Sequence, residues 1–274
     1  MIDQLYPQIA GKASHHPLIG SYLEKALHRA APVGDLLIYA NYIASLDGRI
    51  SLKNPHTGQY DVPASIANQR DWRLYQELAA QADVMLTSAR YFRQLELGCA
   101  QDLLPVGQGD AYDDLRQWRH EQGLSPQPDI VVISQSLDIP IASLRPWLTQ
   151  RKVLIATLTS PSDAKMTPFV DAGIEILHLG DTKVEGLLLK HALIARNYRA
   201  AYMIAGPQVH AMLLEAGVLN RLFLTTRHTL IGGADGHSIL NQDLQIPHVC
   251  RLNSLYLDRD GGQQFADYSI GVAD

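Results

Sequence analysis

The feature that most constrains this fold is an alternation of short apolar runs with amphipathic stretches. From Leu36 onward the runs are "LLIYANYI", "DVMLTS", "DIVVIS", "KVLIATL", "IEILHL" and "AAYMIA", and stretches with helical spacing separate most of them. Strands joined by helices of about ten to fifteen residues form βαβ units, whose strands lie parallel in one sheet. The runs in 221–232 and 250–271 lack such helices and contain the hairpin signal Asp260-Gly261-Gly262. The sequence therefore predicts an α/β fold: a mostly parallel central sheet, flanking helices and antiparallel C-terminal edge strands.

We expect two parts in the chain. Residues 1–35 are predicted to be a partly helical N-terminal extension, because Ile19, Tyr22 and Leu23 fall at helical spacing. Residues 36–274 are predicted to be one α/β domain, since no linker or repeat interrupts them. Within this domain, the stretch from "DVMLTS" to about Gly109 is expected to be irregular.

Composition excludes several classes of function. The net charge of -5, with no cluster of basic residues, argues against a nucleic-acid partner. No segment approaches the roughly 20 apolar residues that cross a membrane, and the N-terminus lacks signal-peptide character. We therefore expect a cytoplasmic protein, with Cys99 and Cys250 as free thiols. No metal site is expected, because the histidines form neither H-x-x-x-H nor H-E-x-x-H.

The stretch "YMIAGPQVHAMLLEAG" runs a buried strand through Gly206-Pro207 into an amphipathic helix that ends at Gly217. Proline suits the first helical turn, and glycine lets another group approach the backbone. The N–H groups of that turn, together with the helix dipole, favour an anion such as a phosphate. A tight strand-to-helix corner with no ligand is the alternative interpretation of these two residues.

Further motifs narrow the choice. "NYIASLDGRISL" follows the first strand, "DVMLTSAR" forms another strand end, and "GPQVHAMLLEAGVLNRLFLTTRHTLIGG" places a strand ending at Ile231-Gly232-Gly233 after the Gly-Pro helix. In this order and spacing, the motifs resemble the reductase domain of bacterial riboflavin biosynthesis proteins, a pyrimidine reductase with the dihydrofolate reductase fold. The resemblance extends from about Leu36 to the C-terminus.

The resemblance implies an NADPH-dependent reductase of a small heterocycle, similar to 5-amino-6-(5-phosphoribosylamino)uracil reductase of riboflavin biosynthesis. It also implies a homodimer. In such reductases NADPH lies across the carboxyl ends of the strands. The implied cofactor contacts are Ile43, Ala44, Ser45, Thr87, Ser88, Ser134, Gly206, Pro207, Gln208, Val209 and His210.

The implied substrate contacts are Asp47, Tyr60, Tyr91 and Ile204. Here the chain departs from the family's pattern. Ile204 stands where the family has a pyrimidine-recognising Glu, Tyr91 where it has a Thr, and Ala79 where it has a phosphate-binding Arg. Three other arginines are candidates for that phosphate: Arg70, Arg90 and Arg93.

These departures leave two alternatives open. One is a reductase of the pteridine or folate type, although the sequence does not reveal the acidic residue that such enzymes use against the pterin ring. The other is a non-catalytic paralogue that keeps the fold and binds NADPH. The catalytic residues themselves are not identified by the sequence, since hydride transfer needs mainly proximity and orientation.

Overall fold

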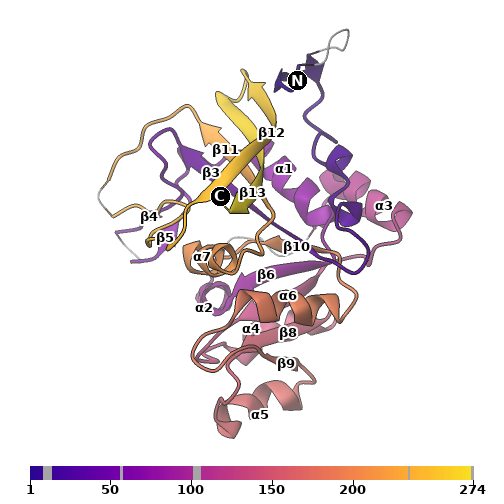
Figure 1. The fold of residues 1–274 in the computed structure, drawn as a ribbon, viewed down its shortest axis with the longest axis vertical. Helices are drawn as coiled ribbons and strands as arrows, with labels where there is room; N and C mark the ends of the chain where they lie inside the picture. The colour runs from indigo at the N-terminus through magenta and orange to yellow at the C-terminus, as the bar shows by residue number, and fades with distance from the viewer. Residues whose placement is uncertain (9–13, 56–57, 101–105, 234, 273–274) are drawn as a thin grey trace.

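One large mixed sheet organises the molecule. A computed structural model describes residues 1–8, 14–55, 58–100, 106–233 and 235–272. Eleven strands of this part pair in the order β2-β1-β12-β13-β11-β3-β10-β6-β7-β8-β9. Figure 1 shows the sheet running from β9 and α5 at one end of the molecule to the N-terminal strands at the other.

The predicted parallel strands are confirmed. Seven neighbours, from β11 to β9 in the sheet order, pair in parallel. They are β3 (Leu37–Ser45), β6 (Val84–Ser88), β7 (Asp129–Ile133), β8 (Val153–Thr157), β9 (Glu175–His178), β10 (Ala200–Met203) and β11 (Arg221–Arg227). Their side chains are mostly buried on both faces, as expected for parallel strands covered by helices.

Helices cover both faces of the sheet. They are α1 (Gln69–Ala80), α2 (Ala89–Glu96), α3 (Asp113–Glu121), α4 (Ile141–Leu148), α5 (Asp163–Asp171), α6 (Gly186–Ile194) and α7 (Pro207–Glu215). Core residues of α6 and α7 pack on one face, and those of α1 to α5 on the other. Among these helices none is long and apolar enough to cross a membrane.

Helix α2 corrects the expectation of an irregular stretch after β6. Its eight residues are too few for a clear periodic signal, but Tyr91 and Phe92 are buried in the core that α2 shares with α4 and α5. Tertiary packing therefore stabilises a helix that its local sequence signals weakly.

The antiparallel edge is also confirmed, and it is larger than expected. β12 (His248–Asp258) and β13 (Gln263–Val272) form a hairpin beside β11, with Gly262 in the left-handed conformation at φ 57°. The N-terminal strands β1 (Ile2–Tyr6) and β2 (His15–His16) extend this edge, because β1 pairs with β12. The prediction of a helical extension missed these strands. The division at residue 35 stays a prediction.

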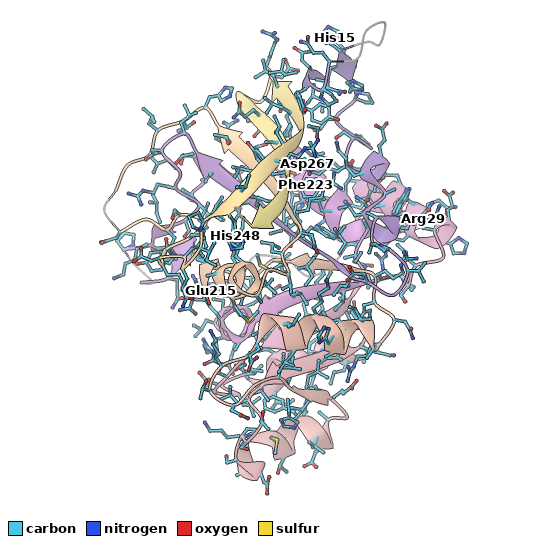
Figure 2. All side chains as sticks on the ribbon, in the orientation of Figure 1. His15, Arg29, Glu215, Phe223, His248 and Asp267 are labelled. Atoms are coloured by element: carbon cyan, nitrogen blue, oxygen red, sulfur yellow. The ribbon has the colours of Figure 1, made fainter. Side chains whose placement is uncertain are left out.

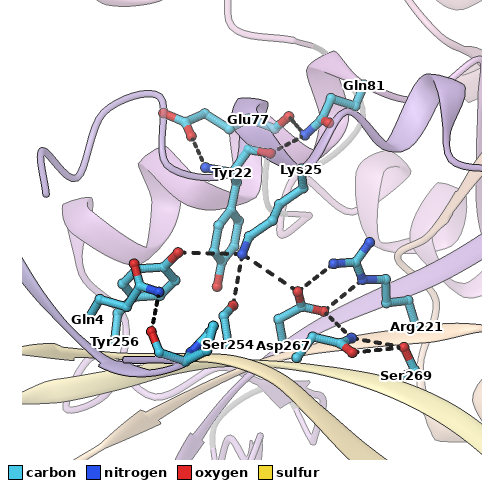
Figure 3. A network of polar contacts seen from close by, with 12 residues as sticks. Gln4, Tyr22, Lys25, Glu77, Gln81, Arg221, Ser254, Tyr256, Asp267 and Ser269 are labelled. Atoms are coloured by element: carbon cyan, nitrogen blue, oxygen red, sulfur yellow. Dashed lines mark hydrogen bonds and ion pairs between the residues drawn. The ribbon is translucent and has the colours of Figure 1, made fainter. Parts of the chain in front are cut away.

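The rest of the N-terminal segment is held against α1 (Figure 3). Two 3-10 turns, Leu23–Lys25 and Leu27–Arg29, replace the continuous helical spacing expected there, with Ala26 between them at φ 49°. The buried Glu77 carboxylate accepts the backbone N–H groups of Gly20 at 2.6 Å and Tyr22 at 2.9 Å. These contacts fix the segment on the α1 face of the sheet.

On that face the antiparallel strands share one core with the neighbouring parallel strands. Phe223 of β11 lies opposite Asp267 of β13 in the strand register, and Figure 2 labels both residues beside the β12–β13 hairpin. Phe223 is fully buried and packs at 4.9 Å from the ring of Tyr22. The N-terminal segment therefore completes the core that β11 and α1 begin.

Candidate active site

The predicted cofactor residues come together at one edge of the sheet. Because β11, β3, β10, β6 and β7 are parallel, their carboxyl ends share an edge, which we call the carboxyl rim. Arg227 pairs with Ser45 there, and Ser88 pairs with Ile133, the residue before Ser134. Open parallel sheets bind their ligands outside this edge. The rim is therefore the candidate active site.

The Gly206 turn occupies the centre of the rim, after β10. Gly206 precedes the first residue of α7 and has a φ of -73°, so the backbone conformation itself does not require glycine. A Cβ built on Gly206 meets no heavy atom within 4 Å. The surface beside Gly206 is thus open to an incoming group, while the anion site expected at this turn stays a prediction.

Not every residue of this turn presents its side chain to that space. Gln208 is exposed and Pro207 half-buried, whereas Val209 and His210 are buried beneath α7. Val209 belongs to the core between α7 and the sheet. The side chains of Val209 and His210 therefore do not face that space, and their N–H groups donate to the carbonyl oxygen of Gly206 at 3.1 Å and 3.3 Å.

The side chain of His210 instead ties α7 to β3. Its Nδ1 lies 3.0 Å from the hydroxyl of Tyr42, which is also 3.4 Å from the carbonyl oxygen of Ala205. Burial lowers the pKa of His210 to about 4, so the imidazole is neutral and Nδ1 can accept the Tyr42 proton. Tyr42 was missed in the sequence because it reads as one more apolar strand residue.

The other implied cofactor residues line the ends of β3, β6 and β7. Ile43 is half-buried and Ala44 buried, and the buried Ser45 accepts the N–H of Arg49 at 3.0 Å. The hydroxyl-bearing residues of β6 and β7 lie at the same edge, Thr87 and Ser134 buried and Ser88 half-buried. Ser45 therefore shapes its own turn, while Ser88 is the more accessible hydroxyl.

Two loops cover the rim from the β3 and β11 ends. Asp47 accepts the backbone N–H groups of Ile231 at 3.0 Å and Gly232 at 2.7 Å, which joins the loops. Hydrogen bonds, the first from Ser45, lower the pKa of the Asp47 carboxyl to about 2. The predicted extension of the strand to Gly233 is wrong: β11 ends at Arg227, because the N–H of Thr229 turns back to the carbonyl oxygen of Arg227 at 2.8 Å instead of pairing with a strand.

Tyr60 lies in the first of these loops, in a small hairpin of β4 (Leu52–Lys53) and β5 (Tyr60–Asp61). Its ring stacks on His237 of the second loop, with centroids 3.7 Å apart and an interplanar angle of 13°. Arg90, at the start of α2, donates to the carbonyl oxygen of Tyr60 at 2.8 Å. Three segments far apart in the sequence thus meet here.

The remaining implied substrate residues are partly or wholly covered. Ile204 follows β10, is half-buried and packs against the two cores on the α1 to α5 face. Tyr91 is buried in the core that α2 shares with α4. Of the two, Ile204 is better placed to contribute an apolar surface at the rim.

A buried carboxyl at the start of α1 was missed altogether. Asp71 lies in the first turn of α1, which begins because Asn68 accepts the N–H groups of Arg70 at 3.1 Å and Asp71 at 3.0 Å. Burial raises the pKa of Asp71 to about 6, although Thr225 donates a hydrogen bond to it. Its Oδ1 atom is buried and has no hydrogen-bond partner.

Asp71 is close to the rim because of the strand register. Thr225 of β11 lies directly opposite Ile43 of β3, an implied nicotinamide neighbour. In sequence, an acid in a first helical turn reads as a favourable partner of the helix dipole, which hides its burial. A buried polar atom without a partner is uncommon in native proteins and marks Asp71 as a candidate ligand-binding group.

Solved structures share this architecture. A pyrimidine reductase-like protein of Corynebacterium diphtheriae is 20% identical with a TM-score of 0.67, over 92% of this chain and 99% of that one. The riboflavin biosynthesis reductase of Saccharomyces cerevisiae is 15% identical with a TM-score of 0.59, over 92% and 99%. Acinetobacter baumannii RibD is 14% identical with a TM-score of 0.63, over 91% of this chain and 62% of its own. The expected fold is confirmed.

A family model identifies the chain more directly than these structures do. No curated protein sequence matches the chain. Residues 37–261 match the model described as the RibD C-terminal domain, which covers the sheet from β3 to the β12–β13 turn. The resemblance drawn from the strand-end motifs is confirmed. The chain is an oxidoreductase and belongs to the RibD C-terminal domain family.

Proposed function

We propose that this protein is an NADPH-dependent reductase of a small heterocycle, of the pyrimidine reductase type found in riboflavin biosynthesis. The observation that carries the proposal is the combination of two features at one rim. An open helix N-terminus follows Gly206, and a buried carboxyl with an unpartnered oxygen lies at Asp71. The first suits a dinucleotide phosphate and the second suits ring N–H groups.

NADPH fits the residues present. The space at Gly206 is unobstructed. In the first turn of α7 the N–H groups of Val209 and His210 donate to the carbonyl oxygen of Gly206, so the N–H of Gln208 is the one that meets a cofactor phosphate in this proposal. When bound, this cofactor supplies a hydride from its nicotinamide ring. Ile43, Ala44 and Ser45 at the end of β3 border the nicotinamide in this proposal, and Ser88 and Ser134 are further contacts. The homodimer implied by the resemblance stays a prediction.

The chain's own residues would position the substrate and exclude water. In this proposal Asp71 holds the edge of the substrate ring through Oδ1, and the carboxyl also accepts a hydrogen bond from the Thr225 hydroxyl. Ile204 adds an apolar surface in place of the Glu expected there. The loops joined by Asp47 close over the rim, which favours a dry site where orientation accelerates hydride transfer.

A pteridine or folate-type reductase is the second candidate, and Asp71 is the observation that favours it. The acidic residue needed against a pterin ring was not recognisable in the sequence, and the structure offers one in a buried position. The same residue weakens the non-catalytic alternative, because an unpartnered buried carboxyl costs stability that a substrate would recover.

The test has two stages. Purified protein should show a higher melting temperature with NADPH, since a ligand at about 100 times its Kd stabilises the native state by about 2.7 kcal/mol. NADPH absorbance should then fall with 5-amino-6-(5-phosphoribosylamino)uracil or, for the second candidate, with a dihydropterin. NADPH binding without oxidation by either substrate class would favour the non-catalytic alternative, and no NADPH binding would refute the proposal.

A further inference from the structure

The three arginines considered for a phosphate differ in their partners. Arg70 places Nε 2.6 Å from a carboxylate oxygen of Asp258. Arg93 donates to the carbonyl oxygen of Asp138 at 2.7 Å and lies 3.3 Å from its carboxylate. Arg90 donates to a backbone carbonyl, that of Tyr60, and forms no ion pair with any carboxylate in the described ranges. Its positive charge is therefore uncompensated by the chain.

Arg49, in the loop after β3, is a second arginine that donates to a backbone carbonyl. Arg49 donates from Nη1 to the carbonyl oxygen of Gly236 at 2.9 Å, and its Nε atom is buried without a hydrogen-bond partner. Arg49 can lie against this backbone because residue 236 is a glycine: a Cβ there would be 2.8 Å from Arg49 Cδ. Among the described residues Arg49 also has no carboxylate partner.

His237 connects the two arginines. Its backbone carbonyl accepts the N–H of Ile50, the residue after Arg49, at 2.9 Å. Its ring stacks on Tyr60, whose carbonyl accepts Arg90. Burial and, second, the charge of Arg90 lower the pKa of His237. Arg49 thus lies against Gly236, and Arg90 acts on the neighbouring His237, so both cations are associated with one short segment of the second loop.

None of the nearby acids in the described ranges forms an ion pair with Arg49 or Arg90. The Asp47 carboxylate is committed to the N–H groups of Ile231 and Gly232. Asp61 follows Tyr60 in a strand, where successive side chains point to opposite sides, and it accepts the amide of Asn54 at 3.4 Å. These carboxylates keep their negative charge, but neither Arg49 nor Arg90 is held in an ion pair among the described residues.

We propose that Arg90 and Arg49, both associated with the Gly236–His237 segment, bind a phosphomonoester. Planar guanidinium groups match phosphate oxygens in paired hydrogen bonds, and two unpaired arginines supply the charge. The inference rests on the proposed function, because it assigns the phosphate to a ligand of the same rim. This phosphate belongs either to a sugar-phosphate substrate or to the 2′-phosphate of the cofactor. Arg90 and Arg49 then serve in place of the family's phosphate-binding Arg, whose position is occupied by Ala79 in this chain.

Titration calorimetry with ribose 5-phosphate, and ribose as its matched control, tests the site on the full chain. We expect binding of the phosphorylated sugar alone. Arg90→Gln should weaken it by roughly 10- to 100-fold, the effect of losing hydrogen bonds to a charged group. Arg93→Gln is the matched control, one helical turn away and already paired with Asp138, and it should leave the affinity unchanged.

The same variants identify the source of the phosphate. If Arg90→Gln weakens NADPH but not NADH, the site holds the cofactor's 2′-phosphate. If it weakens ribose 5-phosphate and leaves both dinucleotides unchanged, the site belongs to the substrate. Equal affinity of wild type and Arg90→Gln for all three ligands would overturn the proposal.

A readout on the wild type covers the case in which Arg90→Gln does not fold. Ribose 5-phosphate should raise the pKa of His237 in an NMR titration, because a phosphate beside the ring favours its charged form. No change in that pKa at saturating ligand, or no binding of ribose 5-phosphate to a protein that binds NADPH, would refute the site. If the wild type does not bind NADPH, the proposed function itself is refuted.

Discussion

The two sides of the carboxyl rim are built in different ways. The side that we propose for the cofactor depends on one continuous stretch, in which β10, Gly206 and α7 follow one another and the surface beside Gly206 is open. The other side, where we propose that Asp71 holds the substrate ring, combines α1 with Tyr60, Arg90 and His237 from three further segments. A local motif can mark the first side in a sequence, whereas only the fold brings the second side together.

The two sides also bury titratable groups with opposite consequences. His210 anchors the cofactor side and has a pKa lowered to about 4, and Asp71 on the substrate side has one raised to about 6. Burial causes both shifts, because it disfavours whichever form carries the charge. Acidification should therefore weaken one side of the rim and relieve the other.

The largest expected effect follows Asp71→Asn. We expect turnover to fall roughly 100-fold, since the amide replaces a charged acceptor of ring N–H groups. Stability should rise at neutral pH by up to about 3 kcal/mol, because the wild type buries a charge there. The stability contributed by the protonated carboxyl is present below 3.8 and is lost as pH rises through about 6.

Urea unfolding of both proteins at about pH 4 and pH 7.5 measures this difference, which should be near zero at the lower pH. The exposed Asp171 at the end of α5 provides a matched control, and Asp171→Asn should change neither turnover nor the pH dependence. An Asp71→Asn protein with full turnover would remove Asp71 from the substrate side.

The predictability of each side follows from this construction. The periodic runs from Leu36 onward predicted the parallel sheet, and Asp260-Gly261-Gly262 predicted the hairpin, because each signal lies within a few neighbouring residues. β1 was not predicted, since an isolated five-residue strand has little signal until β12 is beside it. Asp71 was missed because burial is a property of the whole fold.

The sequence could not show where the side chain of His210 lies. His210 was implied as a cofactor contact, and its ring points instead to Tyr42 beneath α7. The helix pattern already contained the reason: Val209 lies on the buried face at helical spacing from Leu213, and His210 occupies the adjoining position.

An intermediate effect is expected at His210. Its neutral form contributes stability that is fully present above pH 6.5, the ordinary value, and is lost as pH falls toward about 4. The loss amounts to about 3 kcal/mol when complete. In His210→Gln the glutamine does not titrate, so the free energy of unfolding should no longer fall between pH 6.5 and about 4.

This measurement is best made in the Asp71→Asn background, because Asp71 changes stability in the opposite direction between 3.8 and about 6. Urea unfolding at several pH values gives both slopes. If the free energy of unfolding of the double variant falls with pH below 6.5 as steeply as that of Asp71→Asn, then another group titrates there and the assignment of His210 fails.

The smallest effect sharpens the comparison most, because it separates cofactor binding from stability. Gly206→Ala adds one methyl group where no heavy atom lies within 4 Å, at a φ of -73° that alanine adopts freely. Gly109 is the matched control: it also precedes a helical turn, has a φ of -72° and has nothing within 4 Å of its Cβ position.

We expect each alanine to change stability by less than about 1 kcal/mol. Only Gly206→Ala should weaken NADPH, by roughly tenfold in calorimetry, because its methyl group occupies the approach to the helix N-terminus. Equal NADPH affinity in the two variants would mean that the cofactor does not use the open space at Gly206, and the cofactor side would then have to be sought elsewhere along the rim.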